Sequence, residues 1–310
     1  MGYTISPLRY PGGKYNYFSL FRKIIEKDRG INTFVEPFCG GAGLGLALLK
    51  NNIVTKIVLN EYDRFIYLFW DNVLNNTKEL ITLIDKTNLT VNEFLKWKKL
   101  YTDNEFLKSC EDIEIAFGFF IINRATRSGI FNSGPIGGWE KNGKYPIHAR
   151  FKKDNLIEKI KFIESKKNSI DIFNYDYKDF FKIYTQNNFS LKQRDATLFY
   201  FDPPYYKMGK QLYNKYLTKN QHTELRDLLY KKRQYKWILS YDNDQEILNI
   251  FSMFKRKNTA LNHSIYMNRN RKELLFYSDR IYGKYGKFGS VIVKKGRRVR
   301  KEIFSKINQL

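Results

Sequence analysis

Cysteine and histidine are scarce in this chain of 310 residues, which contains only Cys39, Cys110 and three histidines. Two thiols are too few for a disulfide framework or a four-thiolate zinc site, and the scattered histidines do not supply the missing ligands. The sequence therefore predicts neither a disulfide scaffold nor a structural metal.

Long hydrophobic runs are absent as well. No stretch approaches the ~18 consecutive apolar residues of a membrane-spanning helix, and the N-terminal segment MGYTISPLRYPGGK lacks the apolar block of a signal peptide. We therefore expect a soluble, cytoplasmic protein without a membrane partner. The 43% hydrophobic content, with 17% aromatic residues, is enough to fill a substantial core.

Acidic residues are few relative to basic ones: 31 Asp and Glu stand against 55 Lys and Arg, giving a formal charge of +24. An excess of this size attracts polyanions in a salt-dependent manner, so the composition favours contact with DNA or RNA. A biased genome would also enrich lysine, but it does not by itself explain the shortage of acids. The segment from Gly283 to Lys301 contains no acid, which leaves open both a solvated tail and a phosphate contact.

Strand, turn and helix patterns alternate over residues 30–75, give way to helical and loop-rich sequence up to about 165, and resume up to about 280. The expected helices cover residues 43–51, 64–73 and 219–231. The expected strands cover residues 33–36, 56–59, 169–173, 197–201 and 236–240, with a final pair near 264–267 and 273–278. Alternating strands and helices predict an α/β fold with a mostly parallel, doubly wound sheet.

A glycine-rich turn follows the first expected strand, in the segment TFVEPFCGGAGLG at residues 33–45. Glycine permits a tight turn and close approach of a ligand, and the helix that opens near Gly43 adds N–H donors, so the segment indicates a nucleotide-type site. Its spacing departs from GxGxxG and does not identify the nucleotide. Glu61, at the end of the next strand, could accept hydrogen bonds from both hydroxyls of a ribose. The alternative is that Glu61 is an ordinary acidic residue on the surface.

The stretch TLFYFDPPYY, residues 197–206, joins a strand suited to burial on both faces to a stiff polar ending. Each proline fixes φ and removes a backbone donor, so Asp202 lies at the start of a rigid segment. Taken alone, this pattern is equally typical of a strand followed by a structural turn.

Three blocks together are more specific: RYPGGK at residues 9–14, EPFCGG at 36–41 and DPPY at 202–205. Their order and spacing resemble the Dam-like N6-adenine DNA methyltransferases, the D12 or alpha-group class, from Leu8 to about Ser278. The resemblance implies a Rossmann-like class I fold that binds S-adenosylmethionine. It also implies a catalytic domain of residues 1–75 and 166–282, an inserted, mostly helical target-recognition region of residues 76–165, and a basic tail of residues 283–310.

The resemblance also implies which residues contact the cofactor. Glu61 stands where relatives more often carry Asp, and Asp176 is followed by Tyr177 where they carry Phe. The implied cofactor-binding residues are Tyr10, Lys14, Phe38, Cys39, Gly40, Gly41, Glu61, Asp176 and Asp202.

The implied catalytic residues are Asp202, Pro203 and Tyr205. The amino group of a purine is a poor nucleophile because its lone pair is delocalised into the ring. Acceptors for its two hydrogens, here the Asp202 carboxylate and the Pro203 carbonyl, localise that pair and hold the nitrogen in line. The ring of Tyr205 suits stacking on a flipped base. Proton loss follows transfer, when the nitrogen is cationic, so Asp202 is not expected to act as a full general base.

The segment NRATRSGIFNSGPIGG, residues 123–138, resembles the stretch that precedes the DNA-reading hairpin of the family. The candidate contacts to double-stranded DNA are Arg124, Arg127, Asn132 and Arg150. For Asn123 and Arg124 a structural role is at least as well supported by the sequence. A cognate restriction endonuclease is a further candidate partner.

Three other functions stay open on the residues alone: transfer to cytosine N4 or to an amine of RNA or protein, DNA binding without catalysis, and dinucleotide oxidoreduction. Enzymes for cytosine N4 usually carry Ser before the two prolines, and those for RNA or protein usually carry Asn. Asp202 therefore favours adenine.

Overall fold

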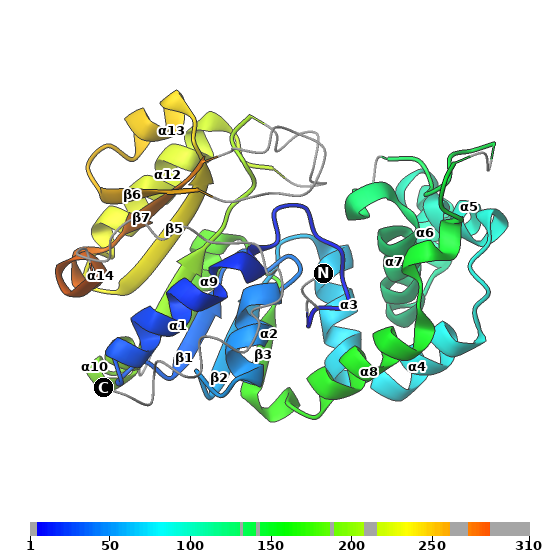
Figure 1. The fold of residues 1–310 in the computed structure, drawn as a ribbon, viewed down its shortest axis with the longest axis horizontal. Helices are drawn as coiled ribbons and strands as arrows, with labels where there is room; N and C mark the ends of the chain where they lie inside the picture. Colours follow the sequence, from blue (N-terminus) through cyan, green and yellow to red (C-terminus); the bar gives the residue numbers. More distant parts are fainter. Residues whose placement is uncertain are drawn as a thin grey trace, which may run out of the picture.

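The computed structural model describes residues 5–130, 133–140, 143–186, 189–207, 216–260 and 272–285. It contains a seven-stranded sheet, drawn in the left and middle parts of Figure 1. The strand order is β3-β2-β1-β4-β5-β7-β6. The strands are β1 (Thr33–Glu36), β2 (Lys56–Asn60), β3 (Ile170–Phe173), β4 (Thr197–Phe201), β5 (Lys236–Asp242), β6 (Lys255–Ala260) and β7 (Lys272–Tyr277).

The first five strands run parallel, whereas β7 pairs antiparallel with both β5 and β6. The strand order reverses between β1 and β4, and ligands of open α/β sheets bind outside the carboxyl ends of the strands at such a point. The expected Rossmann-like, mostly parallel α/β fold is confirmed.

Helices cover both faces of the sheet. Alternate residues of β4 explain why its sequence is continuously apolar: Leu198 and Tyr200 join one buried cluster, and Phe199 and Phe201 join another. The first cluster includes side chains of α1 (Phe18–Lys27), α2 (Gly43–Lys50), α3 (Arg64–Asn75) and α14 (Asp279–Tyr285). The second includes side chains of α9 (Tyr177–Thr185), α12 (Lys219–Lys231) and α13 (Gln245–Ile250), while the short α10 (Leu191–Ala196) leads into β4.

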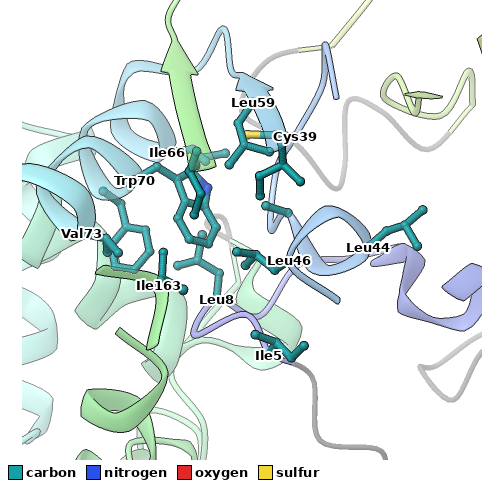
Figure 2. Packing of buried hydrophobic residues seen from close by; sticks show 14 of the residues in the cluster. Ile5, Leu8, Cys39, Leu44, Leu46, Leu59, Ile66, Trp70, Val73 and Ile163 are labelled. Atoms are coloured by element: carbon teal, nitrogen blue, oxygen red, sulfur yellow. The ribbon is translucent and has the colours of Figure 1, made fainter. Parts of the chain in front are cut away.

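A group of helices lies beside the sheet, at the right of Figure 1. It consists of α4 (Thr77–Lys86), α5 (Val91–Lys98), α6 (Asn104–Ser109), α7 (Asp112–Ala125) and α8 (Lys153–Glu164). Helix α7 is buried on nearly all sides, which accounts for its hydrophobic sequence. The apolar core continues into this group: Figure 2 shows Trp70 and Val73 of α3 near Ile163 of α8 and Leu46 of α2. The division into residues 1–75 with 166–282 and 76–165 stays a prediction.

Short 3₁₀ helices connect several of these elements: η1 (Lys14–Tyr17), η2 (Lys99–Tyr101), η3 (Arg127–Gly129), η4 (Ile147–Arg150) and η5 (Lys167–Ser169). In the described part of the chain, no helix has both the length and the apolar character needed to cross a membrane.

One part of the sheet differs from the sequence expectation. The outer partner of β7 is β6 at residues 255–260, whose sequence KRKNTA lacks the apolar alternation that marks a half-buried strand. Cations are typical of an edge strand, because they oppose pairing with other chains. The expected strand at 264–267 lies outside the described residues, as do Asn132 and the tail beyond residue 285.

Candidate functional site

A pocket of about 940 Å³, including its open mouth, lies outside the carboxyl ends of the parallel strands. It is the position that the reversal of strand order predicts. Five residues proposed from the sequence contribute to its wall: Tyr10, Phe38, Glu61, Asp176 and Asp202. The other lining residues are Pro11, Pro37, Tyr62, Asp63, Ile66, Gly129, Tyr177, Pro204, Tyr216, Leu217 and Gln221.

The glycine-rich loop after β1 packs directly against Tyr10. Gly40 has a φ of +45°, which an L side chain rarely adopts, and an added Cβ would lie 2.6 Å from the Tyr10 ring. A Cβ on Gly41 would approach the same side chain to 2.9 Å. The two glycines therefore allow the RYPGGK segment to close over the loop. Cys39, between the strand and these glycines, is buried and does not line the pocket.

Glu61 presents its carboxylate to the pocket at the end of β2. Its Oε2 accepts a hydrogen bond of 2.9 Å from the Gly40 backbone N–H, and its Oε1 accepts one of 3.1 Å from that of Asp63. Burial, and secondarily the Asp63 carboxylate, raise the pKa of Glu61 to about 7, although these N–H donors oppose the shift. Backbone N–H donors, among them that of Tyr62, orient the carboxylate, which keeps lone-pair capacity for a ligand hydroxyl.

Two aromatic rings and a second acid form another part of the wall. The ring centroids of Phe38 and Tyr177 lie 5.3 Å apart. Asp176 caps α9, where its Oδ1 accepts a hydrogen bond of 2.9 Å from the Lys178 backbone N–H. Rings beside a base and acids beside hydroxyls or positive charge are the features that a cationic nucleoside requires, so the lining fits such a ligand.

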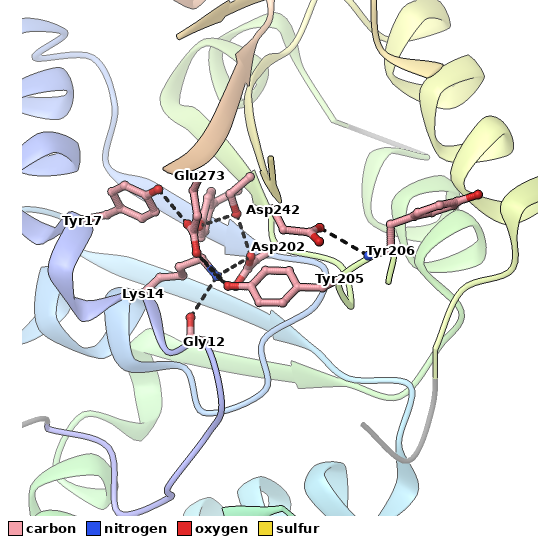
Figure 3. A network of polar contacts seen from close by, with 10 residues as sticks. Gly12, Lys14, Tyr17, Asp202, Tyr205, Tyr206, Asp242 and Glu273 are labelled. Atoms are coloured by element: carbon pink, nitrogen blue, oxygen red, sulfur yellow. Dashed lines mark hydrogen bonds and ion pairs between the residues drawn. The ribbon is translucent and has the colours of Figure 1, made fainter. Parts of the chain in front are cut away.

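The two carboxylate oxygens of Asp202 differ in their hydrogen-bond partners. Its Oδ1 lies 2.8 Å from Lys14 Nζ and accepts a hydrogen bond of 2.6 Å from Ser240 Oγ (Figure 3). Among the described residues, Oδ2 has no hydrogen-bond partner, and the side chain is 21% exposed at the pocket. Burial raises the pKa of Asp202, Lys14 lowers it and Glu273 raises it. One oxygen is therefore anchored within the protein while the other is available as an acceptor.

Lys14 lies behind Asp202, away from the pocket lining. Its Nζ donates to the Gly12 carbonyl at 2.9 Å and lies 3.2 Å from the hydroxyl of Tyr205. That hydroxyl donates a hydrogen bond of 2.7 Å to Glu273 Oε1, and Lys14 Nζ lies 5.0 Å from the centroid of the Tyr205 ring. The hydroxyl of Tyr205 therefore fixes the position of this side chain. Of the DPPY residues, Asp202 and Pro204 line the pocket, whereas Pro203 is buried.

Sequence reasoning missed three polar residues of this site. Ser240 of β5 is buried and lies 2.8 Å from the hydroxyl of Tyr200 while it donates to Asp202. Glu273 of β7 is buried beside Lys14. Glu36 ends β1 with its pKa raised to about 8 by burial and by Asp202. Only Glu36 belongs to one of the three blocks, so the other two carried no motif that could have identified them.

The end of α7 fixes the backbone at the start of the first block, at Arg9. Asn123 accepts a hydrogen bond of 2.8 Å from the Arg9 backbone N–H and donates one of 2.7 Å to its carbonyl. Gly129 has a φ of +76°, and a Cβ there would collide with the Arg9 carbonyl oxygen. Helix α7 and the loop that follows it therefore determine where the backbone next to Tyr10 lies.

The three described arginines of the proposed DNA-contacting set have different environments. Arg124 Nε donates to the Arg150 carbonyl at 2.7 Å, and its Nη1 donates to the Pro7 carbonyl at 3.1 Å. Burial, with Arg9 and Arg150 nearby, lowers the pKa of Arg124 to about 9. The side chains of Arg127 and Arg150 are exposed. The guanidinium of Arg124 is directed to backbone carbonyls, and the other two face solvent.

Comparisons with known proteins agree with this geometry. The family model described as D12 class N6 adenine-specific DNA methyltransferase matches residues 10–265. The type II methyltransferase M.MjaIII of Methanocaldococcus jannaschii is 24% identical over 218 residues, covering 66% of this chain and 70% of that protein. The modification methylase LlaI of Lactococcus lactis subsp. lactis is 23% identical over 208 residues, covering 64% of this chain but only 29% of that protein.

Proposed function

Because the chain belongs to the D12 class of N6 adenine-specific DNA methyltransferases, we propose that Asp202 holds the amino group of a flipped adenine at the pocket during methyl transfer. The protein is a site-specific DNA methyltransferase that acts on adenine and uses S-adenosylmethionine.

The residues that line the pocket support a separate role for each in holding the cofactor. Glu61 accepts hydrogen bonds from the ribose hydroxyls, and Phe38 with Asp176 lies against the adenine ring. Tyr10 closes the site over Gly40 and Gly41. Lys14 and Cys39 do not line the pocket, so their contribution to cofactor binding is indirect. Lys14 contributes through its ion pair with Asp202. The bound cofactor supplies an electrophilic methyl group on a sulfonium.

A single observation carries the role of Asp202: its Oδ1 is anchored by Lys14 and Ser240, while its Oδ2 has no partner among the described residues. Oδ2 accepts one hydrogen of the adenine amine, and the Pro203 carbonyl accepts the other. This pair localises the nitrogen lone pair and aligns it for in-line attack. Tyr205 stacks on the base with the ring face that points away from Lys14.

The helices of residues 76–165 and the exposed cations support binding of duplex DNA. Arg127 and Arg150 contact phosphates or base edges, and Asn132 lies in the same stretch of sequence. Arg124 instead supports the loop through the carbonyls of Pro7 and Arg150. The formal charge of +24 predicts affinity that falls steeply with salt.

A restriction-modification system is the proposed setting, since one relative is named as a type II methyltransferase and the other as a modification methylase. The cognate endonuclease would act on the same DNA sequence, and the cytoplasm is the proposed location because DNA is the substrate.

Transfer of a labelled methyl group tests the proposal. Purified protein is incubated with labelled S-adenosylmethionine and a pool of duplexes that covers short sequences, and the DNA is digested to nucleosides. We expect label in N6-methyladenine at one short sequence. Label in N4-methylcytosine, or in protein alone, would contradict the adenine assignment.

Replacing Glu61 by glutamine is expected to weaken cofactor binding about tenfold or more, since hydrogen bonds to a charged acceptor contribute ~1.5–3 kcal/mol. The ionised carboxylate is the better acceptor, so wild-type affinity should fall as pH drops through the pKa of about 7. The variant should lose this dependence. Calorimetric titration from about pH 6 to 8 measures both effects. Glu79→Gln, at an exposed position on α4, is the control, and equal affinities of the Glu61 variant and wild type would refute the ribose contact.

A further inference from the structure

A buried acid outside the three sequence blocks, Glu273 of β7, lies at the centre of the polar network around Asp202 (Figure 3). Its Oε2 accepts a hydrogen bond of 2.7 Å from Tyr17, and its Oε1 accepts one of 2.7 Å from Tyr205. Lys14 Nζ lies 3.7 Å from the same Oε1. A carboxylate on a residue that is only 2% exposed requires such compensation. These contacts connect β7 to Lys14 of the PGGK segment and to Tyr205 of the DPPY segment.

Lys14 is shared between two carboxylates. Its Nζ lies 2.8 Å from Asp202 Oδ1 and 3.7 Å from Glu273 Oε1. With one ammonium between two ionised acids, these three side chains carry a net charge of −1, since +1 − 2 = −1. Buried negative charge stabilises positive charge that develops beside it. The adenine nitrogen becomes positive as it accepts the methyl group, next to Asp202 Oδ2.

We propose that Glu273 is a positioning residue for methyl transfer, which holds Lys14 and Tyr205 against Asp202 and supplies the extra negative charge that favours the cationic amine. This inference rests on the proposed role of Asp202 and deepens it. The proton that the cationic nitrogen later releases goes to solvent or transiently to Asp202, so Glu273 takes part in no covalent step.

The arrangement has a consequence for pH dependence. Transfer requires ionised Asp202, so the rate falls as pH drops through the pKa of that carboxyl. Burial raises this pKa most and Glu273 raises it further, while Lys14 opposes both. Removing the charge of Glu273 therefore lowers the pKa and moves the acid limb of the rate profile to lower pH. Within the described part of the chain, Asp202 also has electrostatic contact with the titratable groups of Glu36 in β1, Tyr200 in β4 and Tyr241 in β5.

Single-turnover methyl transfer, measured against pH with the preformed complex of enzyme, S-adenosylmethionine and duplex DNA, tests the inference. Glu273→Gln should lower the plateau rate at least about tenfold and move the acid limb to lower pH. Glu273→Asp keeps the negative charge but has a shorter side chain. Its plateau rate should therefore fall, while the acid limb of its pH–rate profile should stay near that of wild type. A purely structural role would lower the active fraction without moving the limb.

Two controls accompany these variants. Tyr17→Phe removes one donor to Glu273 but no charge, so its limb should stay in place. Glu26→Gln removes a charge from an exposed pair with Arg22 and should match wild type in rate and limb.

The inference would be overturned if the acid limb of the pH–rate profile of Glu273→Gln coincided with that of wild type. It would also be overturned if the plateau rate of Glu273→Asp equalled that of wild type. If the Gln variant fails to fold, the Asp variant decides alone. A wild-type profile without an acid limb would instead overturn the role of Asp202, and this inference with it.

Discussion

Asp202→Ala is expected to reduce methyl transfer by about 10³-fold or more while cofactor affinity changes by no more than a few fold. The change removes the acceptor for the adenine amine but leaves Glu61, Phe38 and Tyr10 in the pocket wall. Single-turnover transfer and calorimetric titration with S-adenosylmethionine measure the two quantities on the same preparation.

Asparagine at the same position is the more discriminating variant. Asp202→Asn keeps an oxygen that accepts from Lys14 and Ser240, but it puts an NH₂ donor where Oδ2 faces the substrate amine. We expect a loss of the same order as for alanine. Asp242→Asn is the matched control, because the carbonyl oxygen of the new amide still accepts from the Tyr206 N–H. Its rate should stay within about tenfold of wild type, and comparable losses in both variants would refute a specific role for Asp202.

Asn123→Ala is expected to lower both stability and cofactor affinity, although its side chain does not line the pocket. The change removes both hydrogen bonds to the Arg9 backbone, and each polar group left without a partner costs ~1–3 kcal/mol. Since Tyr10 follows Arg9 directly, the Tyr10 side chain loses its fixed position on Gly40. We expect a fall in Tm of about 5–10 °C and cofactor binding about tenfold weaker, measured by thermal unfolding and calorimetry.

Asn75→Ala is the control for this variant. Asn75 is exposed and donates only to the side chain of Asp71 within the described part of the chain, so its loss should change stability by less than about 0.5 kcal/mol. If Asn123→Ala kept wild-type cofactor affinity, the clamp from α7 would be irrelevant to the pocket.

The centre of the parallel sheet was predictable because strands such as β1 (TFVE) and β4 (TLFYF) are short, mostly buried runs, each followed by a polar or glycine-rich ending. Burial on both faces imposes that pattern locally. The edge strand β6 was not predictable, since a strand with solvent on one side tolerates a sequence such as KRKNTA. Its register depends on pairing with β7, which no local pattern records.

The pocket was predictable to the extent that motifs mark it. Tyr10, Glu61 and Asp202 belong to segments with special turns or strand ends, and the structure brings all three to one cavity. Ser240 and Glu273 lie in the strands KWILSYD and KELLFY, whose pattern marks neither residue as functional. Their importance comes from tertiary contacts with Asp202 and Lys14. Arg124 was ambiguous for the same reason, because only the fold shows that its donors reach backbone carbonyls.

The role of Asp202 as the acceptor for the adenine amine can be observed in a structure of the ternary complex with a non-transferring analogue of S-adenosylmethionine and a methylatable duplex. We expect a flipped adenine whose N6 lies within hydrogen-bond distance of Asp202 Oδ2 and of the Pro203 carbonyl, while Lys14 and Ser240 still hold Oδ1. An adenine whose amine contacts neither acceptor, in a complex with the analogue in the pocket, would contradict this role.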